Sequence, residues 1–365
     1  MSATGTGEPF TGAVVALEAT HARHQLLRFR DGSIDPIPTG PATWDVGSFL
    51  TDPGGTRLVE ELVRRLRRLA RETGEDIDRV ALTLPGTLAG HTTVMRSTRL
   101  GILEPSNVAE QFAGHGAPPC RLYHDAECLA VGEARWGCLR GEGDDPPRAK
   151  NFAYVLVDEG VGSSLFVNGE VLRGAGSAGH LGRLVVEPRG SYNRTFASRG
   201  PLEVFASRPW VSHNIVGEYL SEHGKNAADP ADDSPGTPTA SAFRAAVAAA
   251  AQRDWTALRI DQIAAGLTDR DPIAVTVLDD AARYVGLSIN AIIAVANPPD
   301  IVLGGDLISG LPGFFEMTAS YARRFAWSLA WERTTLRRAA LGRRAQILGA
   351  AELLRGHFRH EPAGS

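Results

Sequence analysis

Apolar residues near the start of the chain fall into two short runs separated by a polar turn. The runs are AVVAL at 13–17 and HQLLRFR at 24–30, and the second ends at Asp31-Gly32, a dipeptide typical of hairpin turns. A third apolar run, VALTLPG at 80–86, ends in a Pro-Gly turn. We therefore expect a β-hairpin and then a buried strand in the first part of the chain.

Between these strands, residues 56–75 have the apolar spacing of a helix. Leu58, Leu62, Leu66 and Leu69 recur every three or four positions, and arginines occupy the other face. Such an arginine run could bind nucleic acid, or it could be the solvated face of a helix. Interleaved acidic residues favour the solvated face, namely Glu60, Glu61 and Glu72.

A further strand and helix follow, and from residue 150 onward the order of elements occurs a second time. Residues 120–137 predict a short strand, a turn at His124-Asp125 and a helix from Ala126. Residues 152–172 predict another pair of strands around a glycine-containing turn.

The second half of the chain adds helices to this order. A helix is predicted from Pro201, and residues 278–310 predict a helix, a strand, a glycine turn and the start of a new helix. The polar, proline-rich stretch 223–242 is typical of a surface loop, and residues 341–358 are typical of a final amphipathic helix.

A β-hairpin followed by helices and further strands is expected in each half of the chain. This repeated order predicts two α/β domains with a cleft between them. We expect a disordered lead at 1–11 and an N-terminal domain formed by 12–122 together with 345–359. A C-terminal domain is expected at 123–344.

Composition and charge narrow the class of protein. The chain has 365 residues, 43% of them hydrophobic, and a formal net charge of -4, so it has no long-range attraction to nucleic acid or to an anionic membrane. No apolar run reaches the roughly 20 residues of a membrane span. Cys120, Cys128 and Cys138 form no C-x-x-C pair, which favours free thiols in a reducing cytoplasm over disulfides or zinc.

Six segments follow one another along the chain in a distinctive order. They are LPG at 84–86, a strand that ends at Asp125, Gly160-Val161-Gly162, LRGAG at 172–176, LGG at 303–305 and LGAA at 348–351. In this order they resemble the ROK family of bacterial sugar kinases and related repressors, within the actin-like ATPase superfamily, from about residue 13 to residue 358. The resemblance implies two actin-like (RNase H-like) α/β domains with an interdomain cleft, ATP and Mg²⁺ as cofactors, a sugar or sugar-like ligand, and a homodimer.

The strand at 120–124 runs into the sequence HDAE, where the family has an Asn-Asp-Ala-Asn segment. The resemblance therefore places Asp125 at the catalytic aspartate. A carboxylate there accepts the proton of a sugar hydroxyl as that hydroxyl attacks the γ-phosphorus of ATP. A second interpretation stays open, in which Asp125 caps the helix that follows.

The two turns that would hold nucleotide phosphates depart from the family pattern. The first reads D-I-G-G-T-K in the family and A-L-E-A-T-H at 16–21 here, with Glu18 in place of a glycine and only Thr20 kept. The second reads G-T-G-V-G in the family and Asp158-Glu159-Gly160-Val161-Gly162 here. Glycines at such turns let the backbone approach a phosphate with no Cβ in the way.

Acidic side chains at these turns bear on nucleotide affinity. A carboxylate about 4 Å from a phosphate charge costs on the order of 4 kcal/mol at an effective dielectric constant of ~20, which is roughly a thousandfold in affinity. Alternatively, Glu18, Asp158 or Glu159 could hold Mg²⁺ and turn the repulsion into a bridge. The resemblance assigns a degenerate nucleotide site to Glu18, Thr20, Glu159, Gly160, Gly162, Gly304 and Gly305.

By the same resemblance, four further residues contact the substrate: Arg99, His124, His180 and Glu203. Either histidine could do acid–base work beside a carboxylate, bind a metal, or be an ordinary exposed residue. The fork of Arg99 suits a phosphate or carboxylate on the ligand.

The family's structural zinc site is also rewritten. Its ligand positions correspond here to Arg183, Arg194, Phe196 and Pro201, none of which binds zinc. We expect no structural zinc and no other metal ligand set, with the loop held by packing.

Three functions fit these residues. The first is a divergent sugar kinase that transfers phosphate from ATP to a sugar hydroxyl with Asp125 as base. The second is another enzyme that uses Asp125 with His124 or His180, and the third is a pseudokinase that binds a ligand. The repressor branch is not expected, because the first strand begins near residue 13 and leaves no room for an N-terminal winged helix.

Overall fold

The computed structural model describes residues 8–30, 33–40, 42–141, 150–223 and 241–357. The turn predicted at Asp31-Gly32 and nearly all of the loop predicted at 223–242 lie outside these residues. The chain forms two compact units, which we describe separately. The first unit comprises the described residues within 1–148, 173–178 and 343–365, and the second comprises those within 149–172 and 179–342.

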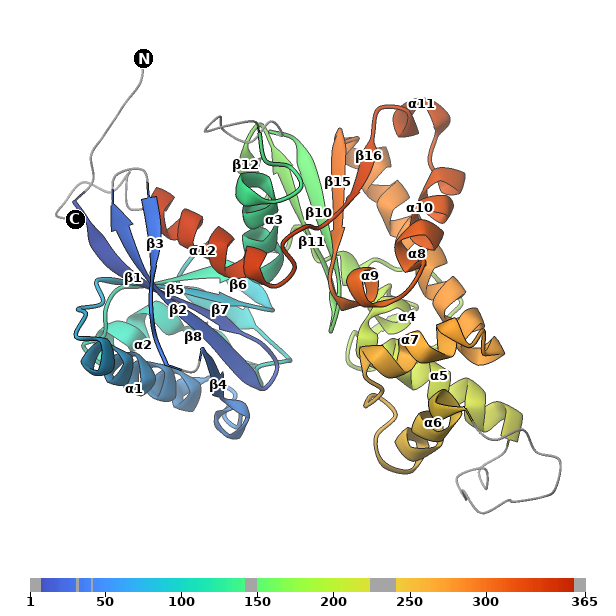
Figure 1. Cartoon of the computed structure of the whole chain (residues 1–365), viewed down its shortest axis with the longest axis horizontal. Helices are drawn as coiled ribbons and strands as arrows, with labels where there is room; N and C mark the ends of the chain where they lie inside the picture. Colours follow the sequence, from blue (N-terminus) through green and yellow to red (C-terminus); the bar gives the residue numbers. More distant parts are fainter. Residues whose placement is uncertain (1–7, 31–32, 41, 142–149, 224–240, 358–365) are drawn as a thin grey trace. The chain divides into compact units, whose positions relative to one another are not determined.

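The first unit is built on a mixed sheet in the strand order β3-β2-β1-β5-β9 (Figure 1). β1 (Phe10–Leu17) pairs antiparallel with β2 (His21–Arg30) and parallel with β5 (Arg79–Leu84), which pairs parallel with β9 (Cys120–His124). Two further strands, β3 (Ser33–Ile37) and β4 (Thr43–Asp45), pair with β2. A separate small sheet consists of β6 (Thr87–Ala89), β7 (Thr93–Arg96) and β8 (Ser106–Asn107). The helices of this unit are η1 (Gly47–Phe49), α1 (Thr56–Thr73), α2 (Val108–Gly114), α3 (Asp125–Trp136) and α12 (Arg344–His357).

Side chains alternate between the two faces of this sheet, as strand geometry requires. Val15 of β1 packs into a core with Leu62 and Leu66 of α1, whereas its neighbour Val14 packs into a second core with Ala351 of α12. The leucine stripe predicted at 56–75 is therefore confirmed as the buried face of α1.

Helices α3 and α12 pack closely together on the second face of the sheet (Figure 1). Two glycines allow this: a Cβ at Gly132 would overlap the carbonyl group of Ala345, and a Cβ at Gly349 would overlap that of Cys128. Because of this contact, α3 belongs to the first unit, and the domain boundary expected between residues 122 and 123 falls inside that unit.

The second unit repeats the arrangement of the first. Its main sheet has the order β12-β11-β10-β15-β16, with an antiparallel hairpin followed by two parallel strands. Ala153, Val155 and Leu303 point from this sheet into a core with the helices that cover it. The elements are β10 (Phe152–Val157), β11 (Val161–Val167), β12 (Glu170–Val171), β15 (Asp300–Gly304), β16 (Thr335–Arg338), the pair β13 (Tyr192–Asn193) and β14 (Ser198–Arg199), η2 (Leu181–Arg183), α4 (Glu203–Ala206), α5 (Arg208–His223), α6 (Ala242–Arg253), α7 (Ile260–Thr268), α8 (Pro272–Ala296), α9 (Asp306–Gly310), α10 (Phe314–Phe325) and α11 (Ser328–Trp331).

Three local predictions need correction. β1 begins at Phe10, inside the expected lead 1–11, whose first seven residues lie outside the described part of the chain. No turn separates β9 from α3, because the helix starts at Asp125 directly after the strand. The helix expected from Pro201 is two helices, since the chain takes an extended conformation at Ser207 between α4 and α5. The two α/β units confirm the predicted fold class, and the cleft between them stays a prediction.

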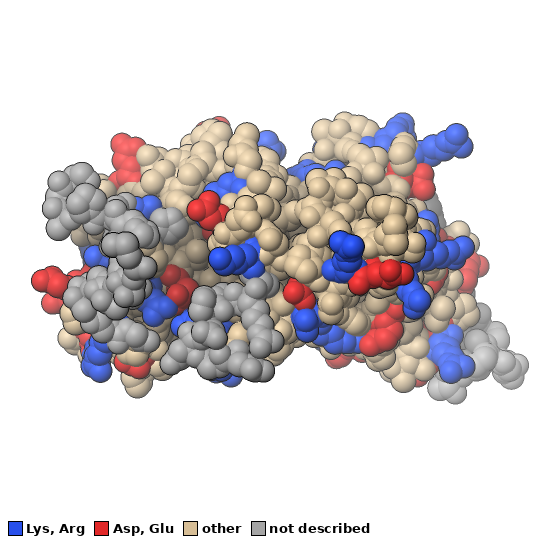
Figure 2. All heavy atoms as spheres, turned by 90° about the horizontal axis from the view of Figure 1, so that it is seen from above, with Lys and Arg blue, Asp and Glu red and all other residues tan. Residues whose placement is uncertain are grey.

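Acidic and basic side chains are interspersed over the face drawn in Figure 2, with no large area of one sign. No helix among the described residues combines the length and the hydropathy needed to cross a membrane.

Candidate functional site

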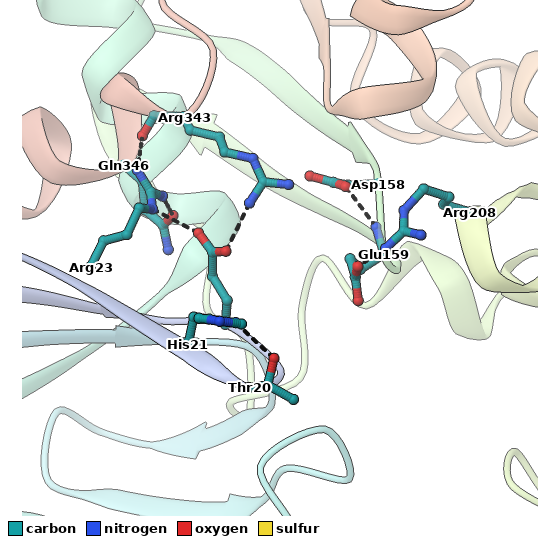
Figure 3. Close-up of polar contacts among 9 residues, drawn as sticks. Thr20, His21, Arg23, Asp158, Glu159, Arg208, Arg343 and Gln346 are labelled. Carbon is teal, nitrogen blue, oxygen red and sulfur yellow. Dashed lines mark hydrogen bonds and ion pairs between the residues drawn. The ribbon is translucent and has the colours of Figure 1, made fainter. Parts of the chain in front are cut away.

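The first candidate phosphate turn joins β1 to β2, and its acidic side chain is paired. The amide of Glu18 donates to the carbonyl oxygen of His21 at 2.7 Å, which closes the turn. One carboxylate oxygen of Glu18 accepts from Nε of Arg23 at 2.7 Å and the other from a terminal nitrogen of Arg343 at 2.8 Å (Figure 3). Glu18 therefore lies between two guanidinium groups rather than presenting an isolated negative charge.

Further hydrogen bonds anchor this cluster to the helix and the sheet. Arg23 donates to the side-chain oxygen of Gln346 on α12 at 2.9 Å and to the carbonyl oxygen of Arg343 at 3.3 Å. Gln346 in turn donates to the hydroxyl of Thr83 on β5 at 3.2 Å. The three charged groups sum to one positive charge, so the expected repulsion between Glu18 and a phosphate is offset within this unit.

The second candidate turn joins β10 to β11 and is held in a similar way. The amide of Asp158 donates to the carbonyl oxygen of Gly160 at 3.0 Å. Glu159 forms an ion pair with Arg208, the first residue of α5, and the amide of Arg208 donates to the carbonyl oxygen of Asp158 at 2.8 Å (Figure 3). Each turn thus pairs its glutamate with arginine.

The candidate catalytic residue lies where β9 ends and α3 begins. Asp125 accepts a hydrogen bond from the amide of Ala126 at 2.7 Å through Oδ1. Nδ1 of His124 lies 3.1 Å from the same oxygen, and both side chains are partly accessible, at 24% for His124 and 18% for Asp125. Asp125 is the first residue of α3 rather than its N-cap, which is His124, and the helix has no side-chain cap hydrogen bond. The capping interpretation is therefore wrong, and the accessible carboxylate is compatible with a role as general base.

Two residues further along α3, a second carboxylate supports this end of the helix. Glu127 is buried and forms an ion pair with Arg173 of the LRGAG segment. Burial raises the pKa of the Glu127 carboxyl group, while the charges of Arg173 and His124 oppose that shift. The pair fixes residues 173–178 to the helix that carries Asp125.

Two of the predicted substrate residues lie in the second unit. His180 directly precedes η2, and its neighbour Gly182 lies against the carboxylate of Glu203 at the start of α4. The structure therefore brings the 180–183 segment and Glu203 together. Their convergence with Asp125, which lies in the other unit, stays a prediction.

The positions that correspond to the family's zinc ligands hold a different contact. The guanidinium carbon of Arg183 lies 4.5 Å from the centre of the Phe196 ring, which is cation–π geometry. The loop between them is also fixed by pairing of Tyr192 with Arg199 and of Val185 with Pro201. Among the described residues, no group of three or more histidines, cysteines, aspartates or glutamates is arranged to hold a metal ion.

The glycines predicted to bind nucleotide also meet structural needs. Gly305 has a φ of 105°, and a Cβ there would overlap the carbonyl group of Val157. A Cβ at Gly304 would overlap the hydroxyl of Tyr154. Gly162 pairs with Leu156 in the hairpin of β10 and β11, and Gly160 closes its turn.

The last two predicted residues lie in the first unit. The hydroxyl of Thr20 is 2.8 Å from Nδ1 of His21, so this retained threonine contacts the residue that replaces the family's lysine (Figure 3). Arg99 is partly exposed in the bend between Ser97 and Ile102.

The sequence alone did not identify the arginines that pair with Glu18 and Glu159. A glutamate in a partly buried turn needs a basic neighbour, and that rule alone could have directed attention to Arg23, two residues after the turn. Nothing local signals Arg343, which is 325 positions from Glu18. The other missed residues are Glu127, Arg173, Arg208 and Gln346.

Comparison with known proteins agrees with the arrangement of the two units. A glucokinase from Halalkalibacterium halodurans is 27% identical over 318 residues, which cover 86% of this chain and 87% of that protein. A crystal structure of a ROK hexokinase from Thermus thermophilus has a TM-score of 0.65 at 22% identity, covering 96% of this chain and all of that one. A ROK family glucokinase from Streptomyces griseus, solved with glucose and AMPPNP, has a TM-score of 0.69 at 18% identity, covering 95% and 99% of the two chains.

The sequence model of the ROK family matches residues 55–215 and 239–357. The match leaves the first hairpin, with Glu18, outside it, and includes the second hairpin, Asp125 and α12. More than half of the chain thus matches the sequence model of one family, and the fold of the chain is similar to that of solved structures of ROK proteins. The chain belongs to the ROK family.

Proposed function

We propose that this protein is a sugar kinase that transfers the γ-phosphoryl group of ATP to a hydroxyl of a sugar or sugar-like molecule. The observation that carries the proposal is the accessible carboxylate of Asp125 at the junction of β9 and α3, beside His124. Membership of the ROK family and the similar proteins named glucokinase and hexokinase support the reaction class.

In this reaction Asp125 acts as general base. Its carboxylate accepts the proton of the attacking hydroxyl while the bond from that oxygen to the γ-phosphorus forms and the bond from phosphorus to the leaving oxygen of ADP breaks. His124, 3.1 Å from Asp125, orients the carboxylate. The Glu127–Arg173 pair positions the first turn of α3.

The substrate side of the proposal rests on polar residues of both units. Glu203 and His180 are suited to accept and donate hydrogen bonds to sugar hydroxyls, and Arg99 to bind a charged substituent. Glu203 lies against Gly182, so its carboxylate is held beside the segment that His180 begins.

The nucleotide side relies on arginines rather than on glycine amides. Arg23 and Arg343 carry more positive charge than Glu18 neutralises, and the excess favours a nucleotide phosphate. Thr20, Gly160, Gly162, Gly304 and Gly305 complete the proposed nucleotide site, with Glu18 and Glu159 holding the arginines in place.

The residues of the first turn do not fit Mg²⁺. The family's metal aspartate is Ala16 here, and the carboxylate of Glu18 is committed to Arg23 and Arg343. We therefore derive no step through a metal held by this turn, and any Mg²⁺ would arrive with the nucleotide.

A second function is favoured by the absence of a metal-binding carboxylate in the first turn, where Ala16 stands and Glu18 is committed to arginines. Such a turn suits a protein that binds a sugar without consuming ATP, or an enzyme that uses Asp125 with His124 or His180 on another substrate. This alternative shares the sugar site and differs in the nucleotide site.

ATP titration separates the two functions. Calorimetry with ATP and Mg²⁺, followed by measurement of ADP release with a panel of hexoses and N-acetylhexosamines, is expected to show binding and turnover. Asp125→Asn is expected to lower kcat by about 10²–10⁴-fold while ATP still binds. Absence of both a calorimetric and a thermal-shift signal at millimolar ATP would overturn the kinase and leave the sugar-binding alternative.

We further propose that the protein is a cytoplasmic homodimer, since two-fold pairing is the commonest assembly of soluble proteins. Light scattering at micromolar concentration measures the mass directly, and a single monomeric species would contradict the proposal.

A further inference from the structure

A pocket of about 420 Å³ lies in the first unit, between strands β2 and β3 and helices α3 and α12. Its volume falls in the range of sites that hold small organic molecules. Its lining carries positive charge on Arg23, Arg135, Arg344 and Arg355, and part of its wall is formed by the aliphatic side chains of Ile347 and Leu348.

The lining of this pocket is positively charged. The described lining residues include four arginines and no aspartate or glutamate. Arg23 is paired with Glu18, and Arg355 with Glu352, both outside the lining. Among the described residues, Arg135 and Arg344 have no hydrogen-bond or ion-pair partner.

The two unpaired arginines line the pocket near the point where the two helices touch. Gly132 of α3 lies against Ala345 of α12, and Arg135 and Arg344 are three residues and one residue away from these contact residues. Two guanidinium groups in a pocket with apolar wall residues match a carboxylate or phosphate head, because their donors fit such planar or multi-oxygen anions.

We propose that this pocket binds a small amphipathic anion, with its carboxylate or phosphate head between Arg135 and Arg344 and its apolar body along Ile347 and Leu348. The pocket lies away from the proposed catalytic carboxylate, although Arg23 of its lining also belongs to the proposed nucleotide site. Asp125 is the first residue of α3 and Arg135 lies ten positions further along, which corresponds to about 15 Å of helix.

Binding of octanoate and octyl phosphate, measured by calorimetry on the full-length protein, tests the proposal. Both probes are expected to bind, with 1-octanol as the uncharged control and inorganic phosphate as the control without an apolar body, each at least about tenfold weaker. A preference between the two probes identifies the head group. Equal affinity for octanol would overturn the role of the arginines, and equal affinity for phosphate would overturn that of the aliphatic wall.

Arg135→Ala/Arg344→Ala is expected to weaken binding of the better probe at least about tenfold. The matched control is Arg323→Ala/Arg324→Ala, which removes the same charge from exposed positions of α10 in the second unit and is expected to leave affinity unchanged. Far-ultraviolet circular dichroism checks that both variants fold, and Arg344→Gln provides a milder change at a single exposed residue. Equal losses in the pocket and control variants, or binding of an acidic peptide in preference to both probes, would refute a small-molecule site.

Discussion

The two hairpins differ in how their glutamates are held, although both join equivalent strands of equivalent sheets. Glu18 is paired with Arg23 from its own hairpin and with Arg343 from the segment before α12, and the cluster continues to Gln346 and β5. Among the described residues, the carboxylate of Glu159 forms an ion pair with a single arginine, Arg208. The glutamate of the first turn is thus paired with two arginines from parts of its unit that are distant in the sequence, whereas that of the second is paired with the first residue of one helix.

The largest expected effect follows from removing the arginines. Arg23→Ala/Arg343→Ala leaves the partly buried Glu18 carboxylate without either guanidinium, and we expect the free energy of unfolding to fall by about 2 kcal/mol. Arg208→Ala is expected to cost about 1 kcal/mol because a single, partly exposed pair is lost. Urea denaturation measures both. Equal losses at the two hairpins would contradict the difference drawn between them.

Removal of the carboxylates is expected to raise the affinity for ATP, and more so at the first hairpin than at the second. Glu18→Gln keeps the size of the side chain and releases two guanidinium groups, so ATP is expected to bind about tenfold more tightly in calorimetry. Glu159→Gln releases one, and a roughly threefold gain is expected. Weaker ATP binding by Glu18→Gln would mean that the carboxylate itself serves the nucleotide, as a bridging metal requires.

One pH-dependent contribution to stability comes from the hairpin of the first unit. His24 of β2 is buried against Trp44, with ring centres 4.2 Å apart, and burial together with the charge of Arg65 lowers the pKa of its imidazole to about 4. Because this value lies below the unfolded value near 6.5, His24 stabilises the fold above pH 6.5, and the contribution is lost as the pH falls from there towards 4.

Replacement of His24 by phenylalanine, whose ring cannot be protonated, isolates the contribution of this histidine to the pH dependence of stability. Between pH 7 and pH 4, His24→Phe is expected to lose on the order of 1 kcal/mol less stability than the wild type. Thermal unfolding across that range measures the difference. Parallel pH profiles for the two proteins would show that the imidazole is protonated in the folded state at no cost.

The smallest effect is expected in the second unit, at the former zinc positions. Arg183→Ala removes the cation–π contact with Phe196 and should lower the free energy of unfolding by about 0.5–1 kcal/mol. Arg194→Ala, at an exposed position of the same loop, is the matched control and should change it by less than about 0.5 kcal/mol. If the control variant loses as much as Arg183→Ala, the contact contributes nothing specific.

The sequence predicted those parts of the molecule that depend on local pattern. The spacing of Leu58, Leu62, Leu66 and Leu69 identified α1, and the repeated order of strand pairs and helices identified two α/β units. The assignment of α3 to the first unit was missed, because it depends on the contact of Gly132 and Gly349 with the opposite helix, which no short stretch of sequence displays.

For the candidate site, too, the sequence identified residues within a short motif and not their distant partners. The HDAE segment led to Asp125, and the structure places Asp125 and His124 in contact because they are adjacent at one strand end. From the sequence alone, the glutamates of the two turns are expected to repel a nucleotide phosphate, because the arginines that pair with them are distant in the sequence or not marked by any motif. Arg343 lies 325 positions from Glu18, and only the folded chain brings these charges together.

Ionic strength distinguishes the two ways in which arginine is used in this protein. The Debye length shortens from about 10 Å at 0.1 M salt to about 3 Å at 1 M, so the exposed edges of the Glu18 and Glu159 ion pairs weaken as salt is added. The face of Arg183 on Phe196 has no counter-charge to be screened and also gains from dispersion. Concentrated salt should therefore loosen the two hairpins while the loop held by Arg183 and Phe196 keeps its shape.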